Sequence, residues 1–89
     1  MKWLENSFTV NNPRGIHGRV ATRLAEIATG HDVQLYIHGA RTCVDCTSIL
    51  DVLSLALVHG SRVTVRAKGT EADRAMSDVE QLFERSDDP

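Results

Sequence analysis

One histidine stands at a position where its ring can do chemistry. His17 lies in the stretch RGIHGRVAT, directly before a segment with helical periodicity. A side chain at a helix N-terminus lies beside backbone N–H groups that have no acceptor within the helix. The positive end of the helix dipole disfavours an imidazolium ion there and stabilises a phosphoryl group attached to the ring. The position therefore predicts a neutral, nucleophilic imidazole that accepts a phosphoryl group.

The neighbours of His17 fit the same chemistry. Arg19 can donate from its guanidinium to phosphoryl oxygens, and Gly18 can offer its backbone N–H. Gly15 and Gly18 also leave the ring open to another protein's active site. The alternative stays open at this point, since a histidine can simply end a loop and Arg19 can be an ordinary solvated charge. The remaining histidines have no obvious partner, and we expect no role for them: His31, His38 and His59.

The rest of the chain alternates between strand and helix patterns. Period-two alternation predicts strands over residues 4–10, 32–38, 41–45 and 61–69, and apolar residues three and four apart predict helices over 18–29, 49–59 and 72–83. Ser48 and Thr70 are predicted helix N-caps, and Thr70 forms a capping box with Asp73. Because each strand has one apolar and one polar face, we predict an antiparallel sheet with one wet face. The fold class is then α+β, an open-faced two-layer sandwich with three helices on one face of a four-stranded antiparallel sheet.

Length, charge and composition argue against several classes of function. The 89 residues fit one domain over positions 1–89, which leaves little volume for an enzyme pocket. The net charge is −2 with dispersed basic residues, and Tyr36 has no paired aromatic platform on the open face, so we expect no nucleic-acid binding. The N-terminus has neither a signal peptide nor a membrane span, which predicts a cytoplasmic protein without membrane insertion.

A pair of cysteines offers little chemistry of its own. Cys43 and Cys46 form a single C-x2-C, which supplies at most half of a tetrahedral zinc site. A cytosolic chain keeps both thiols reduced. We therefore expect no metal site and no organic cofactor.

Two stretches of the sequence resemble the HPr family, the histidine-containing phosphocarriers of the bacterial sugar phosphotransferase system. NPRGIHGRVA resembles the family's active-site signature, and residues 48–69 are similar to its regulatory-serine helix and last strand. The resemblance implies the same open-faced sandwich. It also implies that His17 accepts a phosphoryl group on Nδ1 from phosphorylated enzyme I, that Arg19 steadies it, and that sugar-specific A domains receive it. Such a chain is a covalent carrier, expected to be a monomer, and not an enzyme.

The resemblance implies a second modification site and a docking surface. Ser48 falls on the serine that an HPr kinase/phosphorylase modifies in many relatives. Leu50, with Ile49 and Leu53, matches the family's docking surface near His17. Ile49 and Leu53 also fit the core-facing stripe of the predicted helix, together with Val52 and Ala56, so both interpretations of these two residues stay open.

The sequence departs from the family pattern at four places. Val20 stands where a proline usually follows the arginine, and Gly18 replaces a commoner Ala, Ser or Thr. Thr47 replaces a frequent lysine, and Asp51 places a negative charge one helical turn from Ser48. The altered first turn, at Gly18 and Val20, supports an alternative function, a regulatory HPr-like binding module controlled through Ser48 without a phosphoryl relay. Thr47 and Asp51 weigh against recognition of Ser48 by the kinase. Retention of His17 and Arg19 favours the relay.

Overall fold

The computed structural model describes residues 2–39 and 41–84. Seven elements follow one another along the chain: β1 (Leu4–Thr9), α1 (Gly18–Gly30), β2 (Gln34–His38), β3 (Cys43–Asp45), α2 (Ile49–Ser54), β4 (Arg62–Lys68) and α3 (Ala72–Glu84). The predicted order of elements and the α+β class are confirmed.

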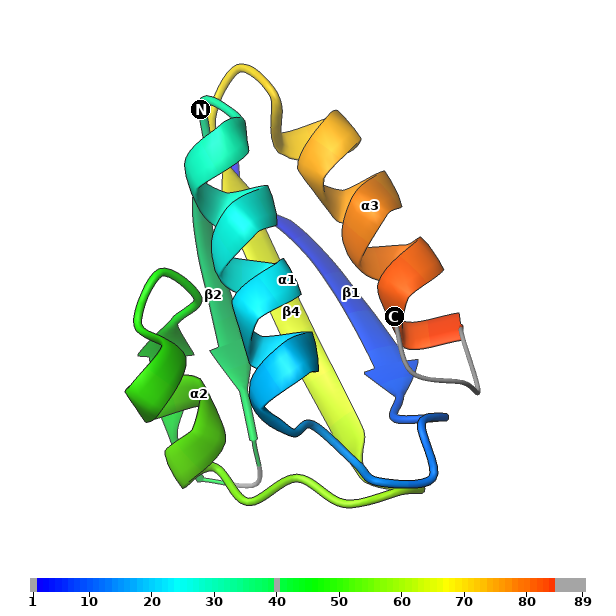
Figure 1. Ribbon diagram of the computed structural model, residues 1–89. Coiled ribbons are helices and arrows are strands. Elements are labelled where there is room, and N and C mark those ends of the chain that lie inside the picture. Colours follow the sequence, from blue (N-terminus) through cyan, green and yellow to red (C-terminus); the bar gives the residue numbers. More distant parts are fainter. Residues whose placement is uncertain (1, 40, 85–89) are drawn as a thin grey trace.

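The four strands form one antiparallel sheet in the order β1-β4-β2-β3. The last strand in the sequence therefore lies inside the sheet, where Val63 pairs with Phe8 of β1 and Val65 pairs with Ile37 of β2. Figure 1 shows α1 and α3 side by side across one face of this sheet and the short α2 beside α1. This is the open-faced sandwich that the alternation of the strands predicts.

Burial follows the sequence periodicity where the elements are long. Alternate residues of β4 are buried under the helices, namely Val63, Val65 and Ala67. The buried residues of α1 recur at helical spacing: Val20, Ala21, Leu24, Ile27 and Ala28. Between α3 and β1, the Phe83 and Phe8 rings stack with centroids 5.5 Å apart. The helices are therefore held on the sheet by one continuous apolar core.

The second helix is much shorter than predicted. It ends at Ser54. The next two bonds are of the 3₁₀ type, in which the Leu55 N–H donates to the Val52 carbonyl and the Ala56 N–H donates to the Leu53 carbonyl. Ala56 then has a φ of 52°, outside the helical range. The apolar residues that continue the helical pattern belong to a loop, where the Leu57 carbonyl accepts a 3.0 Å bond from the Ile16 N–H. Contact with the segment before α1 outweighs local helical propensity here.

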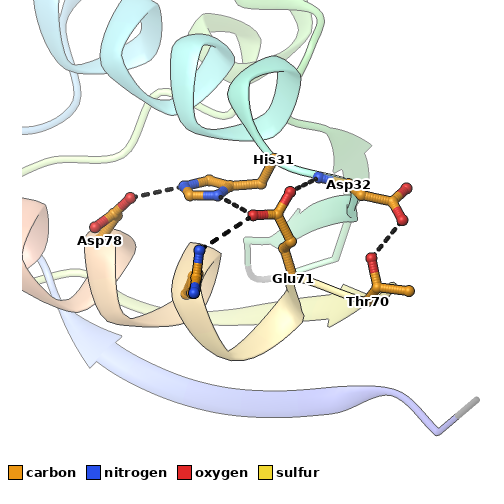
Figure 2. Close-up of polar contacts among 6 residues, drawn as sticks. His31, Asp32, Thr70, Glu71 and Asp78 are labelled. Atoms are coloured by element: carbon orange, nitrogen blue, oxygen red, sulfur yellow. Dashed lines mark hydrogen bonds and ion pairs between the residues drawn. The ribbon is translucent and has the colours of Figure 1, made fainter.

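The third helix begins where the sequence predicts it, but its cap differs from the prediction. The helix begins at Ala72, and the Thr70 hydroxyl donates to the Asp32 carboxylate instead of forming a capping box with Asp73. Glu71 accepts a 2.7 Å bond from the Asp32 N–H. Figure 2 shows these residues in one polar cluster beside His31. The cluster ties the loop after α1 to the beginning of α3.

Candidate functional site

His17 is the N-cap of α1, as its place in the sequence predicts. Its backbone is extended, with φ −101° and ψ −175°, and its carbonyl accepts the first helical bond from the Ala21 N–H at 3.0 Å. The ring turns back to the helix, so that Nδ1 accepts a 3.3 Å hydrogen bond from the Arg19 N–H. An Nδ1 atom that accepts a hydrogen bond carries a lone pair, and the neutral ring then has its proton on Nε2.

The first turn of α1 surrounds this nitrogen with partial positive charge. Gly18 and Arg19 are its first two residues, both exposed, and their N–H groups belong to the helix end that has no carbonyl acceptors of its own. A Cβ atom on Gly18 would meet nothing within 4 Å. The half-buried imidazole of His17 is thus approachable, and the exposed Arg19 belongs to the same turn.

The loop before His17 is held by contacts that the sequence did not reveal. Asn12 is buried, and its side-chain oxygen accepts a 2.9 Å bond from the Arg14 N–H while its carbonyl accepts one from Gly15. Gly15 has a φ of +69°, and a Cβ atom there would collide with the Leu57 carbonyl and lie 2.8 Å from the Cα of Val58. Only glycine fits both the backbone conformation and this close approach. The asparagine before a proline was the one available signal, since such residues favour turns.

Val20, where the family pattern has proline, is part of the core. Its side chain is 4% exposed and packs with the other buried residues of α1. The valine therefore anchors the first turn of the helix through packing, whereas proline would act through a fixed φ.

Ser48 is the N-cap of α2, as predicted. Its Oγ accepts a 3.4 Å bond from the Asp51 N–H, and its carbonyl accepts one from Val52. The serine is half-buried, and the preceding turn is closed by the Asp45 carboxylate, which accepts from both the N–H and the hydroxyl of Thr47. Its hydroxyl oxygen thus has a structural role as a cap.

The residues expected at a docking surface divide between surface and core. Leu50 is 80% exposed and Ile49 is 37% exposed, so the core interpretation of Ile49 is wrong, whereas Leu53 is half-buried and packs against the core. Val58 is 63% exposed. Its exposure was not predicted, because the helical pattern of the sequence continues through the loop that contains it. We call the exposed set Ile49, Leu50 and Val58 the apolar patch. Within this patch, Val58 lies next to Gly15, which stands two residues before His17 in the sequence.

The two cysteines differ in environment. Cys43 is exposed on β3, while Cys46 is fully buried in the core, where burial raises the pKa of its thiol to about 12. Cys46 therefore behaves as a small apolar core residue. No helix within residues 2–39 and 41–84 has the length and apolarity needed to span a bilayer.

Comparison with known families matches residues 4–85 to the model described as "PTS HPr component phosphorylation site". The chain belongs to the HPr family. Its open-faced sandwich also superimposes on HPr-C-His from Thermoanaerobacter tengcongensis with a TM-score of 0.85 and 25% identity, over 91% of each chain. The fold and the family implied by the residues around His17 are therefore confirmed.

Two curated relatives show the range of proteins that this HPr-like chain is similar to. It is 33% identical to the phosphocarrier protein NPr of Shewanella violacea, over 89% of this chain and 87% of that protein. It is 37% identical to a multiphosphoryl transfer protein of Xanthomonas campestris pv. campestris, over 73% of this chain but only 8% of that protein. The chain is an HPr-like phosphocarrier of the phosphotransferase system.

Proposed function

We propose that this HPr-like chain accepts a phosphoryl group on Nδ1 of His17 and passes it on in the phosphoenolpyruvate-dependent phosphotransferase system. In this proposal, residues 1–89 act as one monomeric carrier domain in the cytoplasm, without turnover of their own. The observation that carries the proposal is the hydrogen bond that Nδ1 accepts from the Arg19 N–H, because it directs the nucleophilic lone pair toward the start of α1.

The transfer step follows from this geometry. The hydrogen bond from the Arg19 N–H first breaks, which frees the Nδ1 lone pair. The lone pair attacks the phosphorus of a phosphohistidine on the donor protein, and the new N–P bond forms as the donor's N–P bond breaks. The donor nitrogen keeps the bonding electron pair, while Nε2 of His17 keeps its proton. The phosphoryl oxygens then lie beside the N–H groups of Gly18 and Arg19, within reach of the Arg19 guanidinium. The same step in reverse delivers the group to an acceptor.

The proposed partners are enzyme I as the donor and sugar-specific A domains as acceptors. Similarity to a multiphosphoryl transfer protein supports a phosphotransfer partner in general. The apolar patch is the surface where such a partner would dock, and Leu53, which packs against the core, belongs to the same helix as Ile49 and Leu50. Exposed apolar side chains of this kind are costly in water and become favourable when a partner covers them.

Ser48 remains a proposed regulatory site for an HPr kinase/phosphorylase. A phosphate on its Oγ would replace the capping bond from Asp51 and stand near the carboxylate of that same residue. Like-charge repulsion from Asp51 would therefore oppose the stabilisation that a helix N-terminus gives to a phosphate. This observation favours the carrier function over the alternative of a module controlled only through Ser48.

The test is incubation of the full chain with phosphoenolpyruvate and a bacterial enzyme I, followed by intact-mass analysis. We expect uptake of one phosphoryl group that is lost in acid. His17→Asn should abolish uptake while keeping a good N-cap, and His59→Asn, at an exposed loop position, is the matched control that should retain it. Uptake by the His17→Asn variant would contradict the proposal.

A further inference from the structure

The sheet face opposite the helices carries an aromatic cluster that the histidine chemistry does not use. Trp3, directly before β1, meets Tyr36 of β2 edge to face, with ring centroids 5.7 Å apart and planes at 64°. The Arg66 guanidinium carbon lies 4.9 Å and the Lys68 Nζ 5.5 Å from the Trp3 ring centroid. Arg66 and Lys68 alternate along β4 with the buried Val65 and Ala67, which places this cluster on the open face.

A hollow of about 220 Å³ lies within this cluster, lined by Trp3, Tyr36, His38, Cys43 and Arg66. Three of these side chains are flat rings, and a fourth is a guanidinium. The Nε2 atom of His38 is buried and has no hydrogen-bond partner among residues 2–39 and 41–84. Because buried polar atoms are nearly always paired in folded proteins, this nitrogen is suited to a polar group supplied by a ligand.

The lining specifies the chemistry of its ligand. Aromatic rings and arginine stack on flat heterocycles, and cations beside the hollow attract an anion. The volume is below that of sites for drug-sized ligands, which fits one base with its phosphate outside the hollow. The Glu5 carboxylate lies 3.6 Å from Arg66 Nε and partly offsets its charge, which leaves Lys68 as the more available charge for the phosphate. We propose that this hollow binds a nucleobase that carries a phosphate.

This site is separate from the phosphoryl carrier site. Trp3 supplies a second aromatic ring beside Tyr36, so the expectation that Tyr36 has no aromatic partner on the open face is wrong. The helices cover the other face of the sheet, so a ligand on the open face leaves the start of α1 uncovered (Figure 1). The nucleotide site and the carrier function can therefore fail independently.

Trp3 is the only tryptophan of the chain, so its fluorescence reports binding directly. The full chain is titrated with AMP, with adenosine, with inorganic phosphate and with an oligoadenylate strand, under excitation that nucleotides do not absorb. We expect a saturable change in Trp3 fluorescence with AMP. Adenosine, which lacks the charged phosphate, should bind at least about tenfold more weakly. A tighter, salt-sensitive response to the strand would identify single-stranded nucleic acid as the source of the ligand, whereas equal affinity per site would identify free nucleotide.

Two pairs of variants separate binding from folding. Tyr36→Ala should weaken AMP binding about tenfold, whereas Tyr36→Phe keeps the ring and should leave it unchanged. Lys68→Gln should weaken AMP but not adenosine, whereas Arg23→Gln removes the same charge from the exposed face of α1 and should change neither. All four variants should still accept a phosphoryl group at His17. The absence of a saturable response to both AMP and the strand, or equal binding of adenosine and AMP, would overturn the proposed site.

Discussion

The Nε2 atom of His31, directly after α1, lies 2.8 Å from a carboxylate oxygen of Asp78 in α3, and its Nδ1 lies 3.5 Å from Glu71 (Figure 2). The hydrogen bond to Asp78, more than any other contact, raises the pKa of His31 above its ordinary 6.5. The pKa of Glu71 is lowered, first by the bond from the Asp32 N–H and then by His31. His31, expected to have no partner, thus joins the two long helices.

The cluster around His31 predicts a pH-dependent contribution to stability. A histidine whose pKa is raised by folding stabilises the protein below its unfolded pKa near 6.5, and the effect is lost as pH rises through the folded pKa. Because folding lowers the pKa of Glu71, this residue contributes to stability above its unfolded pKa of about 4.5. That contribution is lost as pH falls through the folded pKa. The difference in unfolding midpoint between the natural chain and His31→Gln should therefore be larger at about pH 5.5 than at about pH 8.

Asp78→Asn provides the control for that measurement. In this background the carboxylate that raises the pKa most is gone, so the pH dependence of the His31→Gln effect should shrink. A difference in midpoint that does not vary with pH in the natural background would contradict the role assigned to His31.

Two nearby glycines should respond in opposite ways to the same substitution. Gly15→Ala forces a side chain into a left-handed backbone and against the Leu57 carbonyl, and we expect a loss of at least about 1–2 kcal/mol of unfolding free energy. Gly18→Ala meets open space in a helix, so it should be neutral or stabilise by up to about 1 kcal/mol. Thermal or denaturant unfolding measures both. Equal effects of the two substitutions on stability would contradict the close contact of Gly15 with the backbone of residues 57–58.

Neighbouring apolar residues of α2 should separate docking from folding. Leu50→Ala, at an 80% exposed side chain, should change stability by less than about 0.5 kcal/mol but slow phosphoryl transfer from enzyme I. Val52→Ala, at a 1% exposed side chain, should cost about 2 kcal/mol of unfolding free energy. The readouts are denaturant unfolding and the initial rate of phosphoryl uptake. An unchanged transfer rate in the Leu50→Ala variant would remove the apolar patch from the docking surface.

Substitution of Ser48 should lower stability through loss of the helix cap and leave phosphoryl uptake unchanged. Ser48→Ala removes the acceptor of the Asp51 N–H, and we expect a loss of about 0.5–1 kcal/mol of unfolding free energy. Phosphoryl uptake by His17 should be unchanged, because the two caps lie on different helices. Ser48→Asn restores a capping oxygen and should recover most of the stability. Loss of uptake in both variants would mean that Ser48 belongs to the carrier site.

Long elements with continuous buried stripes were predictable from the sequence. In β4, Val63, Val65 and Ala67 alternate with polar residues, so only one face of the strand can be buried. The place of His17 at the start of α1 followed in the same way, because Val20 opens the buried stripe of that helix. Local periodicity thus determined both the fold class and the position of the candidate nucleophile.

Features that depend on contacts between loops were not predictable. Apolar residues continue at helical spacing beyond Ser54, yet the chain turns at Ala56 so that Leu57 can meet Ile16. The exposure of Val58 and the partners of His31 depend on segments that are distant in the sequence. No periodicity within a single segment contains that information.

The proposed carrier function depends on one atom, the Nδ1 of His17. The most direct measurement is nitrogen and phosphorus NMR of the isotope-labelled chain after incubation with phosphoenolpyruvate and enzyme I. We predict a phosphorus signal coupled to Nδ1 of a single histidine, absent from the His17→Asn variant and present in the His59→Asn variant. A phosphoryl group on Nε2, on another histidine or on no histidine of the folded chain would contradict it.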